Sequence, residues 1–340
     1  MTTKAPDTDT ALFDLIQSHR VTAAIYVAAK LGVAECLREG PRSPADVARA
    51  IGAEENPIHR LLVALTTIGI CSVNEQYRFS LTKIGAQLDS RSDRSLKAWA
   101  IFEGEILSKS WTGLIESVVS GKTAAQLMGL NNSFDLMSRS SEAVGVFNAA
   151  MRDLTRIVTP QIISAYDFSN TKVLLDVGGG SGQLISAVLQ KHPTMRGIVF
   201  DLPRCAESAK TLFREMGVSE RAEFVEGDFF EAVPTGADTV LLKSIIHDWD
   251  EERGAKILKN CRQAISELGK LLLVERLMPS LPSNDGEHKS HAMSDLNMLR
   301  GPGGRERTKG EYETLLNQNG FRLNAIFLAG LFSVIEAYPL

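Results

Sequence analysis

Apolar residues recur at helical spacing through the first third of the chain and predict three helices. The first carries its apolar positions at Leu12, Leu15, Ile16, Ala23, Tyr26 and Val27 and is capped by Gly32. A second helix is expected to begin at Ser43, because a serine before a proline at the first helical position is a start signal. A third follows Pro57 over residues 56–68 and ends at Gly69.

A β element follows these helices and completes the pattern of a winged helix. Tyr77, Phe79 and Leu81 alternate with polar residues, which is the period of a half-buried strand. Winged helices often bind DNA. In the candidate recognition helix over residues 56–68, however, only His59 and Arg60 are obvious polar side chains that could contact base edges. We therefore favour burial of its apolar face against another chain, which predicts a homodimer through this domain.

The segment from Ser95 to about Thr159 keeps the helical pattern and carries a series of large side chains. These are Trp99, Phe102, Trp111, Phe134, Phe147 and Met151. Such a series packs a core, or it forms the wall of a flat apolar pocket, and spacing alone leaves both readings open.

Short β-rich runs alternate with helices from Val173 onward, which predicts an α/β domain. The expected strands are Val173–Val177, Ile198–Phe200, Glu223–Val225, Thr239–Leu242 and Leu271–Val274, with helices over 182–191 and 252–266 between them. This alternation predicts a mostly parallel sheet covered on both faces, with an antiparallel hairpin over 322–327 and 332–337 at the end. The expected domains are a winged-helix-like dimerisation domain over 1–95, a helical linker over 96–160 and a Rossmann-like domain over 161–340.

Composition changes this picture little but excludes several classes of protein. The 340 residues are 44% hydrophobic and carry a net charge of −4, which fits about two globular domains and disfavours nucleic acid as the main partner. No apolar run reaches the roughly 20 residues of a membrane span, and the polar start lacks a signal peptide's apolar core. Four scattered cysteines without a C-x-x-C pair indicate a reducing cytoplasm.

The glycine-rich loop Asp176-Val177-Gly178-Gly179-Gly180-Ser181-Gly182 carries the first chemical signal. It follows a strand and precedes a helix, where glycines let backbone N–H groups approach a ligand. A P-loop would need Lys-Ser/Thr after its last glycine, and the dinucleotide fingerprint is weakened by Gln183 in its third glycine position. An acid followed by alternate glycines at 178, 180 and 182 is the pattern of S-adenosylmethionine enzymes.

Two further acids at strand ends support that cofactor. Asp201 ends the second strand, at the right distance for a carboxylate that binds two ribose hydroxyls. Asp228-Phe229 follows the third strand and would place a carboxylate and an aromatic face near an adenine. Each acid alone could be a helix cap, but three at successive strand ends meet where α/β proteins bind ligands.

A histidine follows the fourth strand, at the same edge of the sheet. An imidazole with a pKa of about 6.5 can accept a proton near neutral pH, and a phenol with a pKa of about 10 needs that help. Glu275 ends the fifth strand and could hold the ring of His247, and Glu306 lies in a glycine-flanked loop. Two alternatives remain: a helix cap, and a metal site with Asp248, Asp250 and Glu251, which the absence of a second histidine disfavours.

Together these motifs resemble small-molecule S-adenosylmethionine-dependent O-methyltransferases of the plant caffeate, acetylserotonin and bacterial polyketide type. The resemblance covers nearly the whole chain. It is carried by Asp176–Gly182, Asp201-Leu202-Pro203, Gly227-Asp228-Phe229-Phe230, Leu242–Asp250, and Gly303–Thr308 followed by Gly320-Phe321.

The resemblance implies an S-adenosylmethionine cofactor, a homodimer through the N-terminal domain and methylation of a phenolic or similar hydroxyl of a small aromatic metabolite. His247 would be the general base, flanked by Glu275 and Glu306. The residues expected to contact the cofactor are Asp176, Gly178, Gly180, Asp201, Leu202, Asp228, Phe229, Lys243, Ser244 and Trp249. Those expected to line the acceptor pocket are Phe147, Met151, Asp248, Asn297 and Gly301.

One departure bears on the acceptor, and two rival functions remain. Leu154 stands where the plant branch often has a histidine, so the acceptor is not expected to bind as plant phenylpropanoids do. The nearer rival keeps the cofactor but methylates nitrogen or performs hydroxylation, decarboxylation or ring chemistry. The more distant rival is a ligand-responsive transcription regulator, which the acidic net charge disfavours. We expect no metal and no membrane partner.

Overall fold

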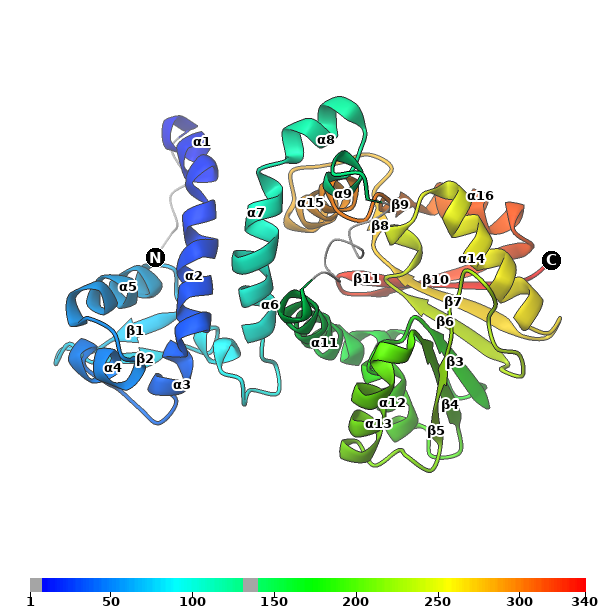
Figure 1. Ribbon diagram of the computed structural model, residues 1–340, viewed down its shortest axis with the longest axis horizontal. Helices are drawn as coiled ribbons and strands as arrows, with labels where there is room; N and C mark the ends of the chain where they lie inside the picture. Colours follow the sequence, from blue (N-terminus) through cyan, green and yellow to red (C-terminus); the bar gives the residue numbers. More distant parts are fainter. Residues whose placement is uncertain (1–7, 131–139) are drawn as a thin grey trace. The chain divides into compact units, whose positions relative to one another are not determined.

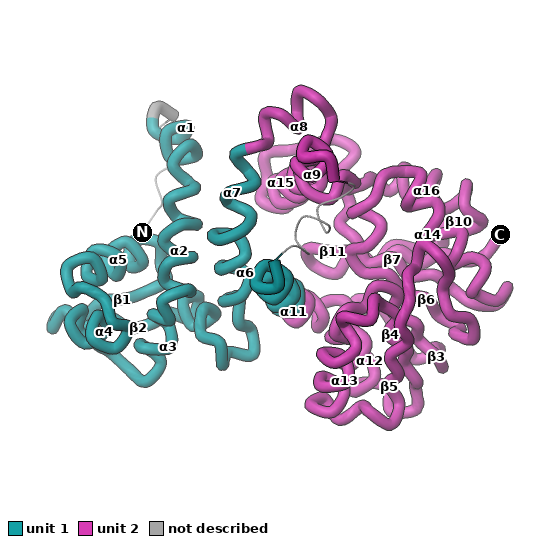
Figure 2. The backbone as a smooth tube through the Cα atoms, in the orientation of Figure 1, with its two compact units in different colours: residues 1–112, 140–154 teal, residues 113–139, 155–340 magenta. Residues whose placement is uncertain are grey.

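The computed structural model describes residues 8–130 and 140–340, which form two compact units (Figure 2). The first unit takes the described residues up to 112 together with residues 140–154. The second takes the remaining described residues, so the predicted linker 96–160 is divided between the units. Phe134 of the predicted aromatic series lies outside the described residues.

The first unit begins with the expected helices, although the first one is interrupted. Its helices are α1 (Thr8–Gln17), α2 (His19–Leu31), α3 (Val33–Leu37), α4 (Pro44–Ile51) and α5 (Glu55–Thr67). Gly32 ends α2 at a φ of 73°, and Ser43 caps α4 through the backbone N–H of Asp46, as predicted. The third predicted helix begins earlier than expected, at Glu55.

The wing is a two-stranded antiparallel hairpin of β1 (Cys71–Val73) and β2 (Phe79–Leu81). Tyr77 was wrongly predicted to lie in the second strand. Its φ of 59° places it in the left-handed region, so the chain is still turning there and the strand starts at Phe79. Phe79 is buried among the apolar side chains of α2 to α5, which explains why the alternation of the sequence is real over this short strand.

The segment that follows is helical but broken into short pieces. It contains η1 (Gly85–Leu88), α6 (Lys97–Phe102), η2 (Glu103–Leu107), α7 (Ser108–Trp111), α8 (Leu114–Ser120), α9 (Ala124–Leu127) and α11 (Ser141–Ala165). In the first unit Phe147 packs edge-on against Phe102, with 5.6 Å between ring centroids. These two rings therefore pack against each other within that unit.

The second unit is built on a seven-stranded sheet in the order β10-β11-β7-β6-β3-β4-β5 (Figure 1). Strands β3 (Val173–Val177), β4 (Arg196–Asp201), β5 (Ala222–Glu226), β6 (Thr239–Lys243) and β7 (Lys270–Glu275) pair in parallel. The terminal hairpin of β10 (Phe321–Ala329) and β11 (Phe332–Pro339) joins antiparallel at β7. The predicted doubly covered parallel sheet with an antiparallel hairpin is confirmed.

Helices cover both faces of this sheet, with α12 and α13 on one face and α14 and α16 on the other (Figure 1). Their bounds are α12 (Gln183–Lys191), α13 (Ala206–Glu215), α14 (Glu251–Ala264) and α16 (Lys309–Gln318). Alternate strand residues such as Leu175, Val240 and Leu242 form one buried core with Ile257 and Leu316. The remaining elements are η3 (Pro203–Cys205), η4 (Ile246–Asp248), β8 (Leu277–Met278), α15 (Gly286–Arg300) and β9 (Arg307–Thr308).

Among the described helices, none combines the length and apolar character that a membrane crossing requires.

Candidate active site

The glycine-rich loop leaves β3 and leads into α12 with the backbone conformations that its sequence predicts. Gly178, Gly180 and Gly182 have φ values of 73°, 58° and 76°, a region that side chains rarely adopt. A Cβ atom at Gly178 would also collide with the Ile245 side chain. The loop therefore needs glycine both for its turn and for its close approach to the segment that carries His247.

Two acids of the loop region lie at the carboxyl ends of neighbouring strands. Asp176 is buried, and this burial raises its pKa to about 7 against the opposing charge of Lys243. Asp201 Oδ2 accepts a hydrogen bond of 2.7 Å from the backbone N–H of Gly180. Its Oδ1 accepts a bond of 2.6 Å from the N–H of Leu202. These two bonds fix the Asp201 carboxylate against the glycine loop. A carboxylate that binds a ribose needs such a fixed orientation.

An aromatic group follows β5 at the same sheet edge. The ring centroid of Phe229 lies 6.2 Å from that of Trp249, and the ring centroid of Phe230 lies 4.8 Å from it. Both phenyl rings are steeply inclined to the indole plane. Asp228 closes the turn before them, accepting a 2.8 Å bond from the N–H of Phe230. The structure therefore brings together the predicted carboxylate Asp228 and the predicted aromatic residues Phe229 and Trp249. This group offers a flat apolar face beside an acid, which suits an adenosine.

The end of β6 connects this edge to the histidine. Burial lowers the pKa of Lys243, and the charges of Asp176 and Glu275 oppose that effect. Ser244 has a φ of 55°, an unusual value for a residue other than glycine, and turns the chain from the strand into η4. The positive charge of Lys243 thus interacts favourably with the carboxylates of Asp176, before the glycine loop, and Glu275, beside His247.

His247 lies on η4 and is held between buried carboxylates. Its Nδ1 lies 3.2 Å from Glu306 Oε1 and 3.5 Å from Glu275 Oε2, and both glutamates are buried. Its Nε2 lies 3.5 Å from Asp248 Oδ1. The structure therefore brings together the three residues predicted as catalytic.

The charges around His247 make it a strong base. Its burial disfavours the imidazolium, but the carboxylates of Glu275, Glu306 and Asp248 outweigh burial and raise the pKa of His247 to about 10. Burial raises the pKa of Glu275 to about 7 and that of Asp248 to about 6, with His247 opposing both shifts. Burial would also raise the pKa of Glu306, but His247 and Ser294 hold it below its usual value. The cluster thus increases the affinity of the imidazole for a proton.

Arg307 fixes the turn that carries His247, a role that the sequence did not reveal. Its fully buried guanidinium donates to the carbonyls of Ile246 and Trp249, each at 3.2 Å, and to Glu251. Glu275 holds the other side of the turn, because its Oε1 accepts from the backbone N–H groups of Ile245 and Ile246. The backbone on both sides of His247 is therefore held by the side chains of Arg307 and Glu275.

Helix α15 fixes Glu306 in a similar way. Ser294 donates to Glu306 Oε1 at 2.7 Å, and Asp295 accepts from the Glu306 backbone N–H at 2.9 Å. Sequence reasoning missed both residues, because α15 is too polar along its length to show an apolar stripe.

The residues that could bind a metal ion near His247 differ from those expected from the sequence. Asp250 caps α14 through the N–H of Arg253, and Glu251 pairs with Arg307, so neither faces His247. Among the described residues, His247, Glu275 and Glu306 do place ligand atoms within 4.8 Å of one another, a spacing that a metal ion could bridge. The same atoms contact one another directly, with His247 Nδ1 at 3.2 Å from Glu306 and 3.5 Å from Glu275.

The residues predicted for the acceptor pocket are spread over both units. Asn297 lies on α15, where its Oδ1 accepts from Arg300, and Gly301 follows that helix. Phe147 and Met151 lie on the part of α11 that belongs to the first unit. Asp248 lies beside His247, so within the second unit it is the predicted acceptor residue in contact with the candidate base.

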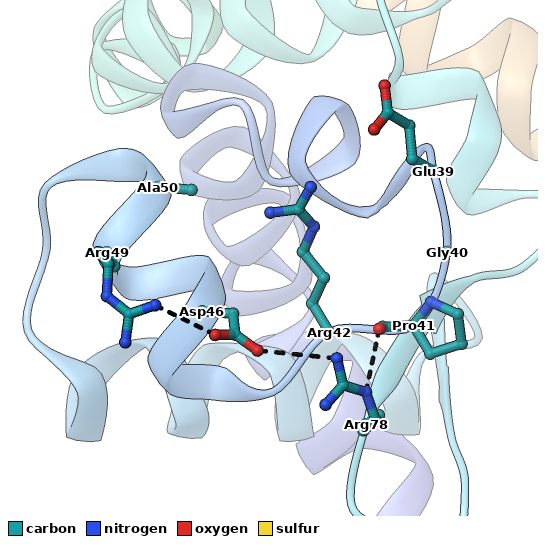
Figure 3. A pocket seen from close by; sticks show the side chains of 8 residues that line it. All are labelled: Glu39, Gly40, Pro41, Arg42, Asp46, Arg49, Ala50 and Arg78. Atoms are coloured by element: carbon teal, nitrogen blue, oxygen red, sulfur yellow. Dashed lines mark hydrogen bonds and ion pairs between the residues drawn. The ribbon is translucent and has the colours of Figure 1, made fainter.

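A separate pocket of about 440 Å³ lies in the first unit (Figure 3). Arg42, Arg49 and Arg78 line it together with Glu39 and Asp46. Asp46 pairs with Arg49 at 3.2 Å and with Arg78 at 3.7 Å, which neutralises much of its basic character. None of the predicted site residues lines this pocket.

Comparison with known proteins extends over almost the whole chain. An O-methyltransferase dimerisation domain matches residues 13–88, and an O-methyltransferase domain matches residues 111–322. The phenazine O-methyltransferase PhzM of Lysobacter antibioticus is 36% identical over 97% of this chain and 96% of its own length. An 8-amino-8-demethylriboflavin N,N-dimethyltransferase of Streptomyces davaonensis is 31% identical over 93% of this chain and 91% of its own length.

A solved structure with bound ligands is also similar. The O-methyltransferase NcsB1 from neocarzinostatin biosynthesis, in complex with S-adenosylmethionine and 2-hydroxy-5-methyl naphthoic acid, superposes with a TM-score of 0.77. It is 29% identical to this chain, and the match covers 94% of this chain and 96% of that one.

Proposed function

The chain belongs to the S-adenosylmethionine-dependent O-methyltransferase family, and from this premise we propose that His247 is the general base for methylation of a hydroxyl on a small aromatic acceptor. The observation that carries the proposal is the contact of Nδ1 with two buried carboxylates, at 3.2 Å from Glu306 and 3.5 Å from Glu275. Two carboxylates at Nδ1, against Asp248 alone at Nε2, favour the neutral ring with its proton on Nδ1 and its lone pair on Nε2, toward the acceptor hydroxyl.

The raised pKa of His247 suits this task. A phenolic hydroxyl has a pKa of about 10, and an ordinary imidazole at about 6.5 takes its proton uphill. The carboxylates around His247 raise its pKa to about 10, so the proton moves between groups of similar affinity. After the transfer the same carboxylates stabilise the imidazolium.

The cofactor is S-adenosylmethionine, and the residues of the second unit suit its adenosine. When bound, it supplies the activated methyl group. Asp201, held by the N–H groups of Gly180 and Leu202, would bind the ribose hydroxyls. Asp228, Phe229 and Trp249 would hold the adenine, and Lys243 and Ser244 would contact the same ligand from β6. The close approach of Gly178 to Ile245 supports this arrangement, because the loop lies directly against the turn that presents the base.

The acceptor is expected to be a hydroxylated aromatic compound. Phenazine and naphthoate ring systems are named for the relatives, which favours a fused or substituted aromatic ring here. Within the second unit, the residues proposed to line its pocket are Asp248, Asn297 and Gly301.

Incubation with S-adenosylmethionine labelled in its methyl group tests the reaction. The protein would be offered a hydroxyphenazine, a hydroxynaphthoic acid and, for each, the matching compound that lacks the hydroxyl. The proposal predicts a labelled methyl ether, seen by mass spectrometry, only from a hydroxylated compound. Labelled product from the matching compounds would contradict methylation of the hydroxyl.

Methylation of nitrogen is the second candidate, because one relative is named as an N,N-dimethyltransferase at 31% identity. An aminonaphthoic acid added to the same series distinguishes the two. Transfer to the amine with none to the hydroxyl would favour this alternative. An aromatic amine already carries a lone pair for the attack, so His247 would only take up the proton that the methylated nitrogen releases.

The dimerisation domain supports a homodimer, and we propose that the apolar face of α1 mediates it. Leu12, Phe13 and Ile16 are between 63% and 66% exposed, although large apolar side chains are usually buried. The matching dimerisation domain begins at residue 13, so this face lies at its start.

A further inference from the structure

Cys205 is a side chain at the cofactor edge that neither the motifs nor the family match assigns. It ends η3, the single turn that follows Asp201-Leu202. The Cys205 N–H donates to the Leu202 carbonyl at 2.9 Å, which closes this turn and brings the thiol back over the end of β4. Its Sγ consequently lies 3.5 Å from Asp201 Oδ1.

The Cys205 thiol thus contacts Asp201, the carboxylate proposed to bind the ribose. Asp201 already accepts from the Gly180 N–H at Oδ2 and from the Leu202 N–H at Oδ1. A carboxylate has about four acceptor positions, so three protein donors fix its orientation and still leave room for a ribose hydroxyl. The two backbone donors sit one on each oxygen, and the thiol adds a second donor to Oδ1.

The thiol keeps its proton at this position. Burial and the neighbouring Asp201 raise the pKa of Cys205, so the group is an S–H donor at neutral pH and not a thiolate. A thiolate would repel the Asp201 carboxylate, whereas a thiol can donate to it.

We propose that Cys205 is a positioning residue for the cofactor: its S–H group holds the Asp201 carboxylate in the orientation that turns its remaining acceptor position toward a ribose hydroxyl. The inference rests on the proposed role of Asp201 as the ribose-binding acid. It concerns cofactor affinity and is therefore independent of the acceptor and of His247.

Binding of S-adenosylhomocysteine to the full-length protein, measured by calorimetry, tests this role. Cys205→Ala removes the donor and should weaken binding by about three- to tenfold, the value of one modest hydrogen bond. Cys205→Ser restores a donor of similar size and should bind within about twofold of the wild type. Cys36→Ala, at a half-buried cysteine of the first unit, is the matched control and should bind as the wild type does.

A double-mutant cycle separates positioning from a loss of packing. In an Asp201→Ala background the Cys205→Ala change should have no further effect, because the thiol then has nothing to position. An equal loss in both backgrounds, or unchanged affinity in Cys205→Ala, would overturn the inference. If Asp201→Ala itself binds as tightly as the wild type, the ribose assignment is wrong and the role of Cys205 falls with it. A loss in Asp201→Ala but none in Cys205→Ala overturns only the role of Cys205.

Discussion

At the scale of single residues, the chemistry depends on the three carboxylates that surround the imidazole of His247. The sequence predicted His247, Glu275 and Glu306 because each stands at a strand end or in a glycine-flanked loop of a recognisable motif. It did not predict Arg307, Ser294 or Asp295, which hold the turn and Glu306 in place. A polar residue in a polar segment gives no sign that folding will bury it, so these partners become visible only when the chain is folded.

Replacing Glu306 by Gln should shift the pH dependence of the reaction to lower pH. The unprotonated His247 is the active form, so kcat/KM rises with pH until the base is fully deprotonated. Loss of the Glu306 charge removes one of the carboxylates that raise the pKa of His247. Its proton then leaves at lower pH.

The measurement is kcat/KM across pH 6 to 10, together with the NMR titration of isotopically labelled histidine. Asp285→Asn, at an exposed acid near the start of α15, is the matched control and should leave the profile in place. A profile that stays unchanged in Glu306→Gln would show that this carboxylate does not set the basicity of His247.

At the scale of elements, the strongest predictions came from strands with continuous apolar runs. All five predicted parallel strands exist, and the glycine loop lies between β3 and α12 as its sequence requires. The sequence did not predict α3, α15 or the break between α1 and α2, which are short or polar features. In such elements tertiary contacts decide the backbone, and local periodicity carries little of that information.

Gly178→Ala should weaken cofactor binding, because the new methyl group displaces the Ile245 side chain next to the His247 turn. Gly217→Ala is the matched control: Gly217 has a φ of 68°, but a Cβ there meets nothing within 4 Å. Both variants should lose about 1–2 kcal/mol of stability from backbone strain.

Only Gly178→Ala should lose affinity for S-adenosylhomocysteine, by more than about tenfold. A loss of about 1.4 kcal/mol of binding free energy through disturbed packing corresponds to a tenfold weaker affinity. Thermal unfolding and calorimetry report the two quantities separately. Equal affinities in the two variants would mean that the glycine loop does not need its close contact with Ile245.

At the scale of the whole molecule, two family domains match the chain, a dimerisation domain over residues 13–88 and an O-methyltransferase domain over residues 111–322. The sequence could not show how residues 96–160 divide, since helical periodicity is the same on either side of a domain boundary. The structure places residues 97–112 with the first unit and the helices α8 and α9 with the second.

Charges on the exposed face of α1 should separate the dimer. The double variant Phe13→Glu with Ile16→Glu places two carboxylates on side chains that are 63% and 64% exposed, and light scattering should report a monomer. Leu268→Glu, at a 95% exposed apolar residue of the second unit, is the control and should remain a dimer. A dimer that persists in the double variant would place the interface elsewhere.

The most direct test of the account is the rate of methyl transfer by His247→Ala, measured together with its affinity for S-adenosylhomocysteine. A general base contributes about 10²–10⁴-fold, so the rate should fall by that factor while the affinity stays within about twofold of the wild type. His288→Ala, a half-exposed histidine on α15, should leave both quantities unchanged. Transfer at the wild-type rate by His247→Ala would contradict the central claim.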